Sequence, residues 1–160
     1  MPSKEATAQV VPTAAGTGTT VETVGDRIDI GGGQISSNQD NLFHSFEQFD
    51  ITANQTANFE TIPGVQNVFG RINDVAPSVI DGTLQVSGSS ANLYLINPAG
   101  ILMGPNVGLN LSGGFTATTA TSIGFDNGQL TAETYGYDSL AGAPENLYFN
   151  REATGSIDNL

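Results

Sequence analysis

Short runs in which hydrophobic and polar residues alternate recur along most of the chain, and they predict β-strands. In residues 26–30 this pattern places Ile28 and Ile30 on one face, and the glycines 31–33 end the run. After Gly82 the runs become regular, with turn residues between them and apolar pairs at Leu84/Val86, Leu93/Leu95, Ile101/Met103, Leu109/Leu111, Phe115/Ala117 and Ile123/Phe125. No stretch of a dozen residues carries the spacing of an amphipathic helix. We therefore expect an all-β fold.

The runs return at a nearly constant interval, which is typical of stacked coils. The interval is 22 or 25 residues for five pairs: Leu84 and Leu109, Leu93 and Phe115, Ile101 and Ile123, Phe59 and Leu84, and Val68 and Leu93. Three short strands per coil would turn alternate side chains inward, so that successive coils bury one another. We predict a right-handed, single-stranded parallel β-helix with extra short β-hairpins. An antiparallel sandwich is the alternative, but only Asp81-Gly82 and Asn127-Gly128 are typical hairpin turns.

The ends of a stacked coil expose unpaired strand edges, so a covering segment is expected before the repeat. Residues 41–49 (NLFHSFEQF) contain three phenylalanines, which are large enough to close a narrow apolar core. We predict that this segment is an N-terminal cap, formed by Asn41, Leu42, Phe43, His44, Ser45, Phe46 and Phe49. Near the other end, residues 147–149 and 154–158 predict strand, turn and strand in a further coil.

The first residues are interpreted separately from the repeat. Residues 1–19 are predicted to be flexible, and residues 20–160 to form the β-helix domain. Ala6-Thr7-Ala8 before Gln9 has the small-x-small form that signal peptidase cleaves, so we expect that an export signal is removed from a longer precursor.

Composition excludes several classes of function. Four basic residues stand against sixteen acidic ones, giving a net charge of −12, so no basic patch is available to bind nucleic acid. The chain has no cysteine, which excludes disulfides, thiolate catalysis and cysteine-ligated metals. Its single histidine, His44, cannot build a multi-histidine metal site, and no G-x-S-x-G motif accompanies it. We expect no catalytic residues, metal or cofactor, and interpret His44 as a structural hydrogen-bonding residue.

The carboxylates leave a less favoured alternative open. Paired acids can hydrolyse polysaccharides, and the candidates are Asp26, Asp29, Asp74 and Asp81. Turns and strand edges are expected at these positions, where acids more often cap or face solvent. Residues 126–128 are interpreted as a turn rather than a calcium site, and the glycines 31–33 lack the lysine of a phosphate loop.

Four ordered motifs resemble a known family. They are residues 41–49 (NLFHSFEQF), 76–86 (APSVIDGTLQV), 91–104 (ANLYLINPAGILMG) and 113–120 (GGFTATTA). Together they resemble the two-partner secretion (TPS) domain of filamentous-haemagglutinin-type exoproteins, and the cyanobacterial variety of it most. The resemblance spans roughly residues 18–127.

The resemblance implies a role in export rather than catalysis. Such a domain leads a large adhesin-like exoprotein through the periplasm of a Gram-negative-type envelope to the cell surface or the medium. Periplasmic POTRA domains of a dedicated outer-membrane β-barrel transporter recognise it, and outside the cell it nucleates β-helix folding. We expect a monomer with no nucleic acid or small-molecule partner. A glycan-binding adhesin module and, less favoured, a polysaccharide-cleaving enzyme are the alternatives.

In this family an N-P-N-G-I motif is tied to secretion. Asn97, Pro98, Ala99, Gly100 and Ile101 match it, with alanine in place of the second asparagine. The same residues are typical of a β-turn, because Pro98 fixes φ and Gly100 tolerates positive φ. A second family motif, N-P-N-L, is not found in the sequence. The motif is therefore a candidate for partner recognition, with a purely structural corner as the alternative.

Overall fold

Strands make up nearly all of the regular structure. The computed structural model describes residues 9–14, 16–131, 137–149 and 155–160. Within these residues the only helical element is one 3-10 turn, η1 (Tyr137–Ser139), and no helix among them is long and apolar enough to cross a membrane. The predicted all-β fold is confirmed. The proposed signal-peptidase site, residues 6–8, lies outside the described residues.

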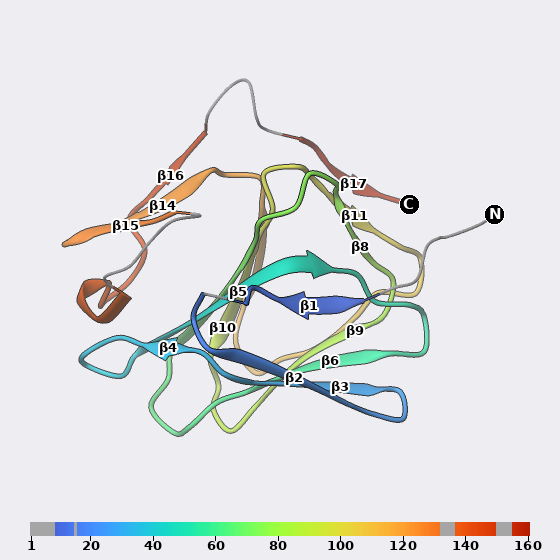
Figure 1. Ribbon diagram of the computed structural model, residues 1–160, viewed down its shortest axis with the longest axis horizontal. Coiled ribbons are helices and arrows are strands. Elements are labelled where there is room, and N and C mark those ends of the chain that lie inside the picture. Colours follow the sequence, from blue (N-terminus) through green and yellow to red (C-terminus); the bar gives the residue numbers. More distant parts are fainter. Residues whose placement is uncertain (1–8, 15, 132–136, 150–154) are drawn as a thin grey trace.

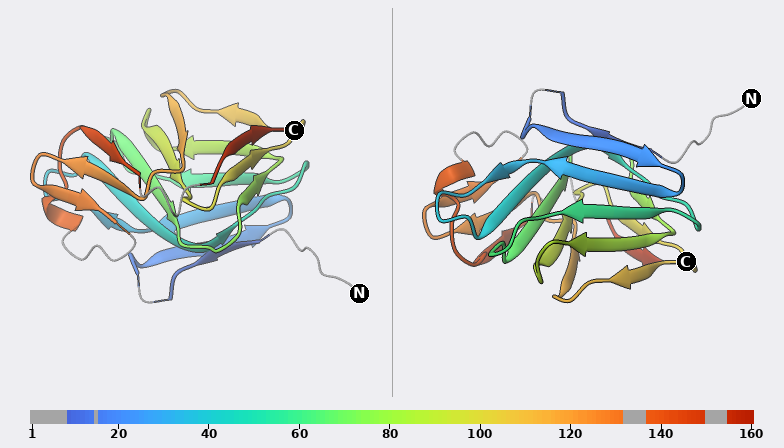
Figure 2. Two further views of the ribbon diagram at one scale, coloured as in Figure 1. Left: turned by 90° about the horizontal axis from the view of Figure 1, so that it is seen from above. Right: turned by 90° about the horizontal axis from the view of Figure 1, so that it is seen from below.

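The chain winds through stacked coils, and the strands of successive coils pair in parallel to form three faces (Figure 1). Face 1, whose strands lie side by side in the right panel of Figure 2, contains β3 (Arg27–Gly32), β6 (Thr56–Glu60), β9 (Thr83–Ser87) and β12 (Gly108–Asn110). Face 2 contains β5 (Asn41–Phe49), β7 (Asn67–Ile72), β10 (Asn92–Ile96) and β13 (Phe115–Thr118). Face 3 contains β8 (Ser78–Ile80), β11 (Ile101–Met103) and β17 (Ile157–Asn159). This is the predicted single-stranded parallel β-helix, and the antiparallel sandwich is wrong.

The register agrees with three of the five predicted pairs. Leu84 lies opposite Leu109, and Leu93 lies opposite both Val68 and Phe115. The pair Phe59 and Leu84 is wrong, because Leu84 lies opposite Ala57. The corner between β6 and β7, residues 61–66, is two residues longer than the corresponding corner between β9 and β10, residues 88–91.

The fifth pair, Ile101 and Ile123, is also wrong, because the chain leaves the stack after β13. Ile123 belongs to a small antiparallel outer sheet, beside the coils in Figure 1, formed by β14 (Ser122–Phe125), β15 (Gly128–Leu130) and β16 (Asn146–Tyr148). Ile101 pairs instead with Ile157 of β17, which completes the third side of the last coil. The predicted strands near residues 147 and 157 are therefore present, but only the second lies in a coil.

Antiparallel strands cover the N-terminal end of the stack. They are β1 (Val10–Pro12) and β4 (Gln34–Ile35), which pair with β5, and β2 (Thr19–Val24), which pairs with β3. The covering layer is thus formed by these strands, whereas residues 41–49, predicted as the cap, form the face 2 strand of the first coil. β1 lies within residues 1–19, the segment that the sequence analysis separates from the β-helix domain.

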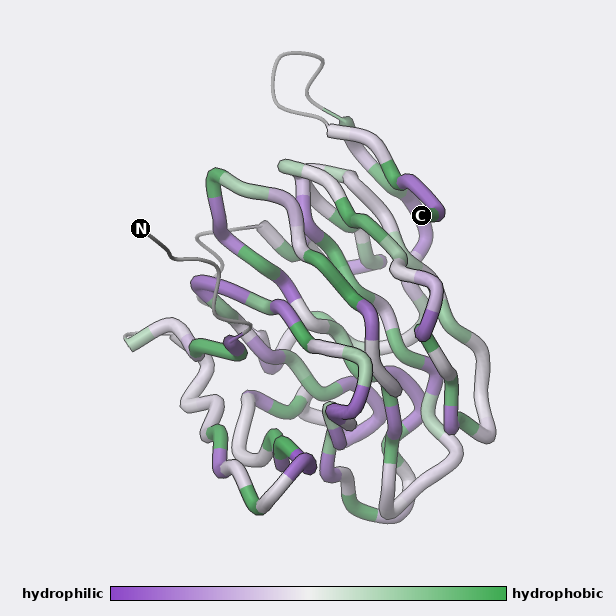
Figure 3. The backbone as a smooth tube through the Cα atoms, turned by 90° about the vertical axis from the view of Figure 1, so that its right-hand side faces the viewer, coloured by the Kyte–Doolittle hydropathy of each residue, from purple (hydrophilic) through white to green (hydrophobic). Residues whose placement is uncertain are grey.

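Inward side chains of successive coils form one continuous apolar core. Figure 3 shows hydrophobic and hydrophilic residues alternating along the coils, as inward and outward positions require. The core members are Leu, Ile, Val, Phe and Ala, and the largest fully buried ones include Phe46, Phe49, Phe59, Leu93 and Leu95. No coil has a core of its own, so each depends on its neighbours.

A ladder of asparagine side chains connects the coils where face 2 begins. Asn67 donates from Nδ2 to Asn41 Oδ1 at 2.9 Å, and Asn92 donates to Asn67 Oδ1 at 3.0 Å. At its two ends the ladder bonds the backbone: Asn41 donates to the carbonyl of Leu140 at 2.9 Å, and the N–H of Gly114 donates to Asn92 at 2.8 Å. These amides stabilise the stacking and fix its register.

We expect Asn67→Ala to lower the free energy of unfolding by about 2 kcal/mol, because it leaves the buried Asn41 Oδ1 without its donor. The matched control is Asn110→Ala on face 1, where the exposed Asn110 donates to Oε1 of the half-buried Gln85 at 2.8 Å. There water replaces the lost partner, so a loss under about 1 kcal/mol is expected. Urea unfolding measures both, and equal losses would contradict a stabilising role specific to the buried ladder.

Candidate functional site

The candidate secretion motif forms the corner between β10 and β11. The N–H of Gly100 donates to the carbonyl of Asn97 at 3.0 Å, which closes a β-turn. The side chain of Asn97 accepts the N–H of Ala99 at 2.9 Å and donates to Ser78 Oγ at 3.0 Å. One side chain therefore shapes the turn and attaches it to the preceding coil.

The backbone of this corner is held from both sides. Toward the preceding coil, coil 2 (β6, β7 and β8), the N–H of Ser78 donates to the carbonyl of Gly100 at 3.1 Å. Toward the last coil, the N–H of Gly155 donates to the carbonyl of Pro98 at 2.6 Å, and that of Ile101 donates to Ser156 at 3.0 Å. The corner is thus part of the stacking itself.

Gly100 is required by its geometry. Its φ is 128°, a conformation that L side chains rarely adopt. A Cβ at this position would also lie 3.0 Å from the carbonyl oxygen of Ser156 and 3.4 Å from Pro77 Cβ. Asn97 and Ile101 are fully buried, and only Pro98 and Ala99 are partly exposed. A partner that meets the folded domain therefore finds little of the motif on the surface.

Residues 41–49 alternate between two environments. Leu42, His44 and Phe46 lie opposite the inward residues of β7, whereas Phe43 turns outward. The rings of Phe46 and Phe49 are 5.1 Å apart and close the first coil of the core. Coil 2 separates this segment from the Asn97 corner, so the two predicted groups do not form one site.

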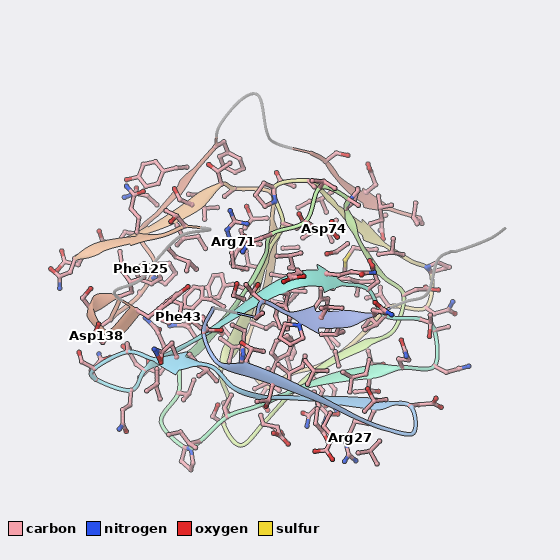
Figure 4. The ribbon with its side chains drawn as sticks, viewed as in Figure 1. Arg27, Phe43, Arg71, Asp74, Phe125 and Asp138 are labelled. Atoms are coloured by element: carbon pink, nitrogen blue, oxygen red, sulfur yellow. The ribbon has the colours of Figure 1, made fainter. Side chains whose placement is uncertain are left out.

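Outward residues of face 2 form a second aromatic core that the sequence analysis missed. Phe43 stacks on Phe69 at 5.1 Å, and Phe69 stacks on Tyr94 at 4.7 Å. Phe125 of the outer sheet packs on this stack, 5.4 Å from the ring of Phe69, and Figure 4 places it close to Phe43. Positions 43, 69 and 94 have the spacing of the asparagine ladder, which is the signal that could have revealed them.

Three of the four carboxylates considered for catalysis, Asp29, Asp74 and Asp81, accept hydrogen bonds that hold strands and corners in place. Asp29 accepts from Arg27 Nε at 2.8 Å, and this hydrogen bond lowers the pKa of Asp29. Asp81 accepts the N–H of Asn106 at 2.8 Å, and Asp74 accepts the N–H of Ala76 at 3.1 Å. Among the described residues, no three of His, Cys, Asp or Glu are grouped to hold a metal ion. These contacts favour structural roles for the acids.

Comparison with known proteins agrees with this architecture. The sequence model of the TPS secretion domain matches residues 8–157, nearly the whole chain. The chain belongs to the TPS secretion domain family. It is therefore a TPS secretion domain, as the ordered motifs predict.

A crystal structure of a filamentous hemagglutinin secretion domain has the same fold. The TM-score is 0.57 at 24% sequence identity, over 71% of this chain. The match covers 43% of that chain, so this TPS domain spans less than half of the structure it resembles. Among curated protein sequences, none matches this chain.

A buried cation joins the coils of the TPS domain to the segment that leaves them. Arg71 of β7, labelled in Figure 4, donates to the carbonyl of Ile72 at 2.8 Å and to that of Thr121 at 3.2 Å. Its Nε has no hydrogen-bond partner among the described residues, and burial lowers its pKa to about 10. Because Thr121 directly precedes β14, these bonds hold the base of the outer sheet against face 2.

His44 is buried beneath the covering strand β2. Its Nδ1 lies 3.0 Å from Thr19 Oγ1, and its ring packs against those of Phe46 and Phe59. Its Nε2 has no partner among the described residues, and burial lowers the pKa of His44 to about 4. A charged imidazolium is therefore strongly disfavoured in the folded domain.

The folded domain should lose stability in acid through His44. An unfolded histidine has a pKa near 6.5, so between pH 6.5 and 4 the unfolded chain binds the extra proton, and stability falls as pH falls. We expect His44 to contribute about 2 to 3 kcal/mol to the loss between pH 7.5 and 4.5.

The control is His44→Leu, because Leu95 occupies the corresponding inward position two coils away. Urea unfolding at both pH values should show a smaller acid loss for His44→Leu than for the wild type. An identical pH dependence in the two proteins would contradict the assignment.

Proposed function

We propose that this TPS domain is recognised, before it folds, by the periplasmic POTRA domains of a dedicated outer-membrane β-barrel transporter. The exoprotein that carries it would then cross the outer membrane and reach the cell surface or the medium, where the domain folds and nucleates the β-helix behind it. The observation that carries this proposal is the burial of the secretion motif: Asn97, Gly100 and Ile101 are covered by neighbouring coils once the fold is complete.

Three further properties support recognition and passage in an unfolded state. The chain has no cysteine, so no disulfide can close it in the oxidising periplasm. Its alternating strands, when unpaired, are suited to adding to the edge of a partner sheet. The net charge of −12 would speed the encounter with a basic groove.

The order of recognition and folding can be tested with an engineered disulfide. Thr56 and Thr83 lie opposite one another on β6 and β9, and neither is fully buried. We expect the double variant Thr56→Cys/Thr83→Cys, expressed with its transporter in a Gram-negative host, to accumulate in the periplasm because the crosslink joins two coils. Immunoblots of periplasm and medium measure the distribution.

Each single cysteine variant, and the double variant in a host without its periplasmic thiol oxidase, should be secreted normally. Normal secretion of the double variant with its disulfide demonstrably formed would contradict passage in an unfolded state.

Substituting two prolines, one at a time, tests whether the motif is recognised by the transporter or only forms a corner of the fold. Pro98 lies in the motif, whereas Pro105 lies in the next corner, between β11 and β12, and is exposed. We expect Pro98→Ala to reduce secretion about tenfold, and Pro105→Ala to leave it unchanged, with both unfolding free energies within about 1 kcal/mol of the wild type. Equal secretion of the two variants would mean that the motif is a turn only.

A further inference from the structure

The outer sheet has an open edge made of apolar residues. Its strand order is β15–β14–β16, so among the described strands β16 pairs only with β14, on one side. Figure 1 shows β16 at the outside of the molecule, beyond β14. Leu147, Tyr148 and Phe149 are 44%, 43% and 53% exposed. Three consecutive large hydrophobic residues at an unpaired edge are normally avoided, because they favour pairing with another strand.

One apolar row crosses this sheet and stops at the edge. Leu130 of β15 and Leu147 of β16 both lie opposite Ile123 of β14, so the three side chains share one face. Leu130 and Ile123 are buried, and they belong to the second aromatic core with Phe43 and Phe69. Leu147 continues their row but is almost half exposed. The row therefore lacks a neighbour on its outer side.

A second copy of β16 would supply that neighbour. If two β16 strands pair antiparallel about Leu147, each Leu147 lies opposite the partner's Leu147 and each Asn146 opposite the partner's Tyr148. Glu145, the nearest charged residue before the strand, then lies opposite the partner's Phe149, so no like charges meet across the pair. The apolar row becomes continuous from Leu130 of one copy to Leu130 of the other.

We propose that β16 is a homodimerisation edge, through which two copies join their outer sheets about a twofold axis. Such an isologous contact closes on itself and does not propagate. It leaves the coils of both copies untouched and is independent of the proposed route of secretion. Because each copy carries a net charge of −12, the association is weak and strengthens with salt.

The experiment is analytical ultracentrifugation of the whole chain over a range of concentrations. We expect a reversible monomer–dimer equilibrium, with a dimer fraction that rises between 0.05 and 0.5 M salt. Leu147→Lys and Leu147→Glu, each alone, should weaken dimerisation at least tenfold, because like charges then face one another at the twofold axis. Mixing the two variants should restore the dimer as a heterodimer, which only apposition of position 147 with itself explains.

The matched controls are Ile62→Lys and Ile62→Glu. Ile62 is 51% exposed, but it lies in the corner after β6, away from the outer sheet, and these variants should dimerise like the wild type. Phe149→Lys, placed opposite the partner's Glu145, should tighten the dimer. Thermal unfolding midpoints verify that all variants are folded. A monomer at every concentration, as the sequence analysis predicts, or a mixture that fails to restore the dimer, would overturn the proposal.

Discussion

The parallel register between neighbouring coils is the constraint on which the rest of this structure depends. Each inward side chain is buried only because the residue at the same position of the next coil covers it. A shift of one residue would turn the apolar set outward, so the register needs devices that a uniform apolar core does not supply. The amide ladder of Asn41, Asn67 and Asn92 is one such device, because each amide finds its partner in one register only.

Corners carry the same constraint where strands change direction. At the Asn97 corner, a turn with its own internal bonds is also bonded to the coils before and after it. A residue that shapes the corner is therefore enclosed when the stack forms. Under the proposed function this gives one segment two successive roles, as a signal in the unfolded chain and as a structural corner in the folded one. Folding on the outer side would then remove the signal and oppose return.

The sequence predicted those parts of the fold that repeat at a constant interval. Alternation identified the strands of faces 1 and 2, and the 25-residue spacing correctly paired Val68 with Leu93. It failed at Ile101, whose partner Ile157 follows 56 residues later, because the outer sheet is inserted between them. A search for constant spacing cannot detect such an insertion, since its strands obey local hairpin pairing. For the same reason the aromatic core beneath the insertion was missed, although Phe43 and Phe69 repeat with the coils.

The corner geometry tolerates the departure of this chain from the family motif, alanine at the third position. Asn97 contributes a side chain that both accepts and donates, Pro98 fixes the direction of the chain, and Gly100 occupies a conformation closed to other residues. The third position contributes its backbone N–H, which donates to Asn97, and its side chain is partly exposed. Ala99 can therefore replace asparagine there without the loss of any corner bond made by the backbone. If the transporter reads the unfolded motif, the side chain of the third position is not part of what it requires from this domain.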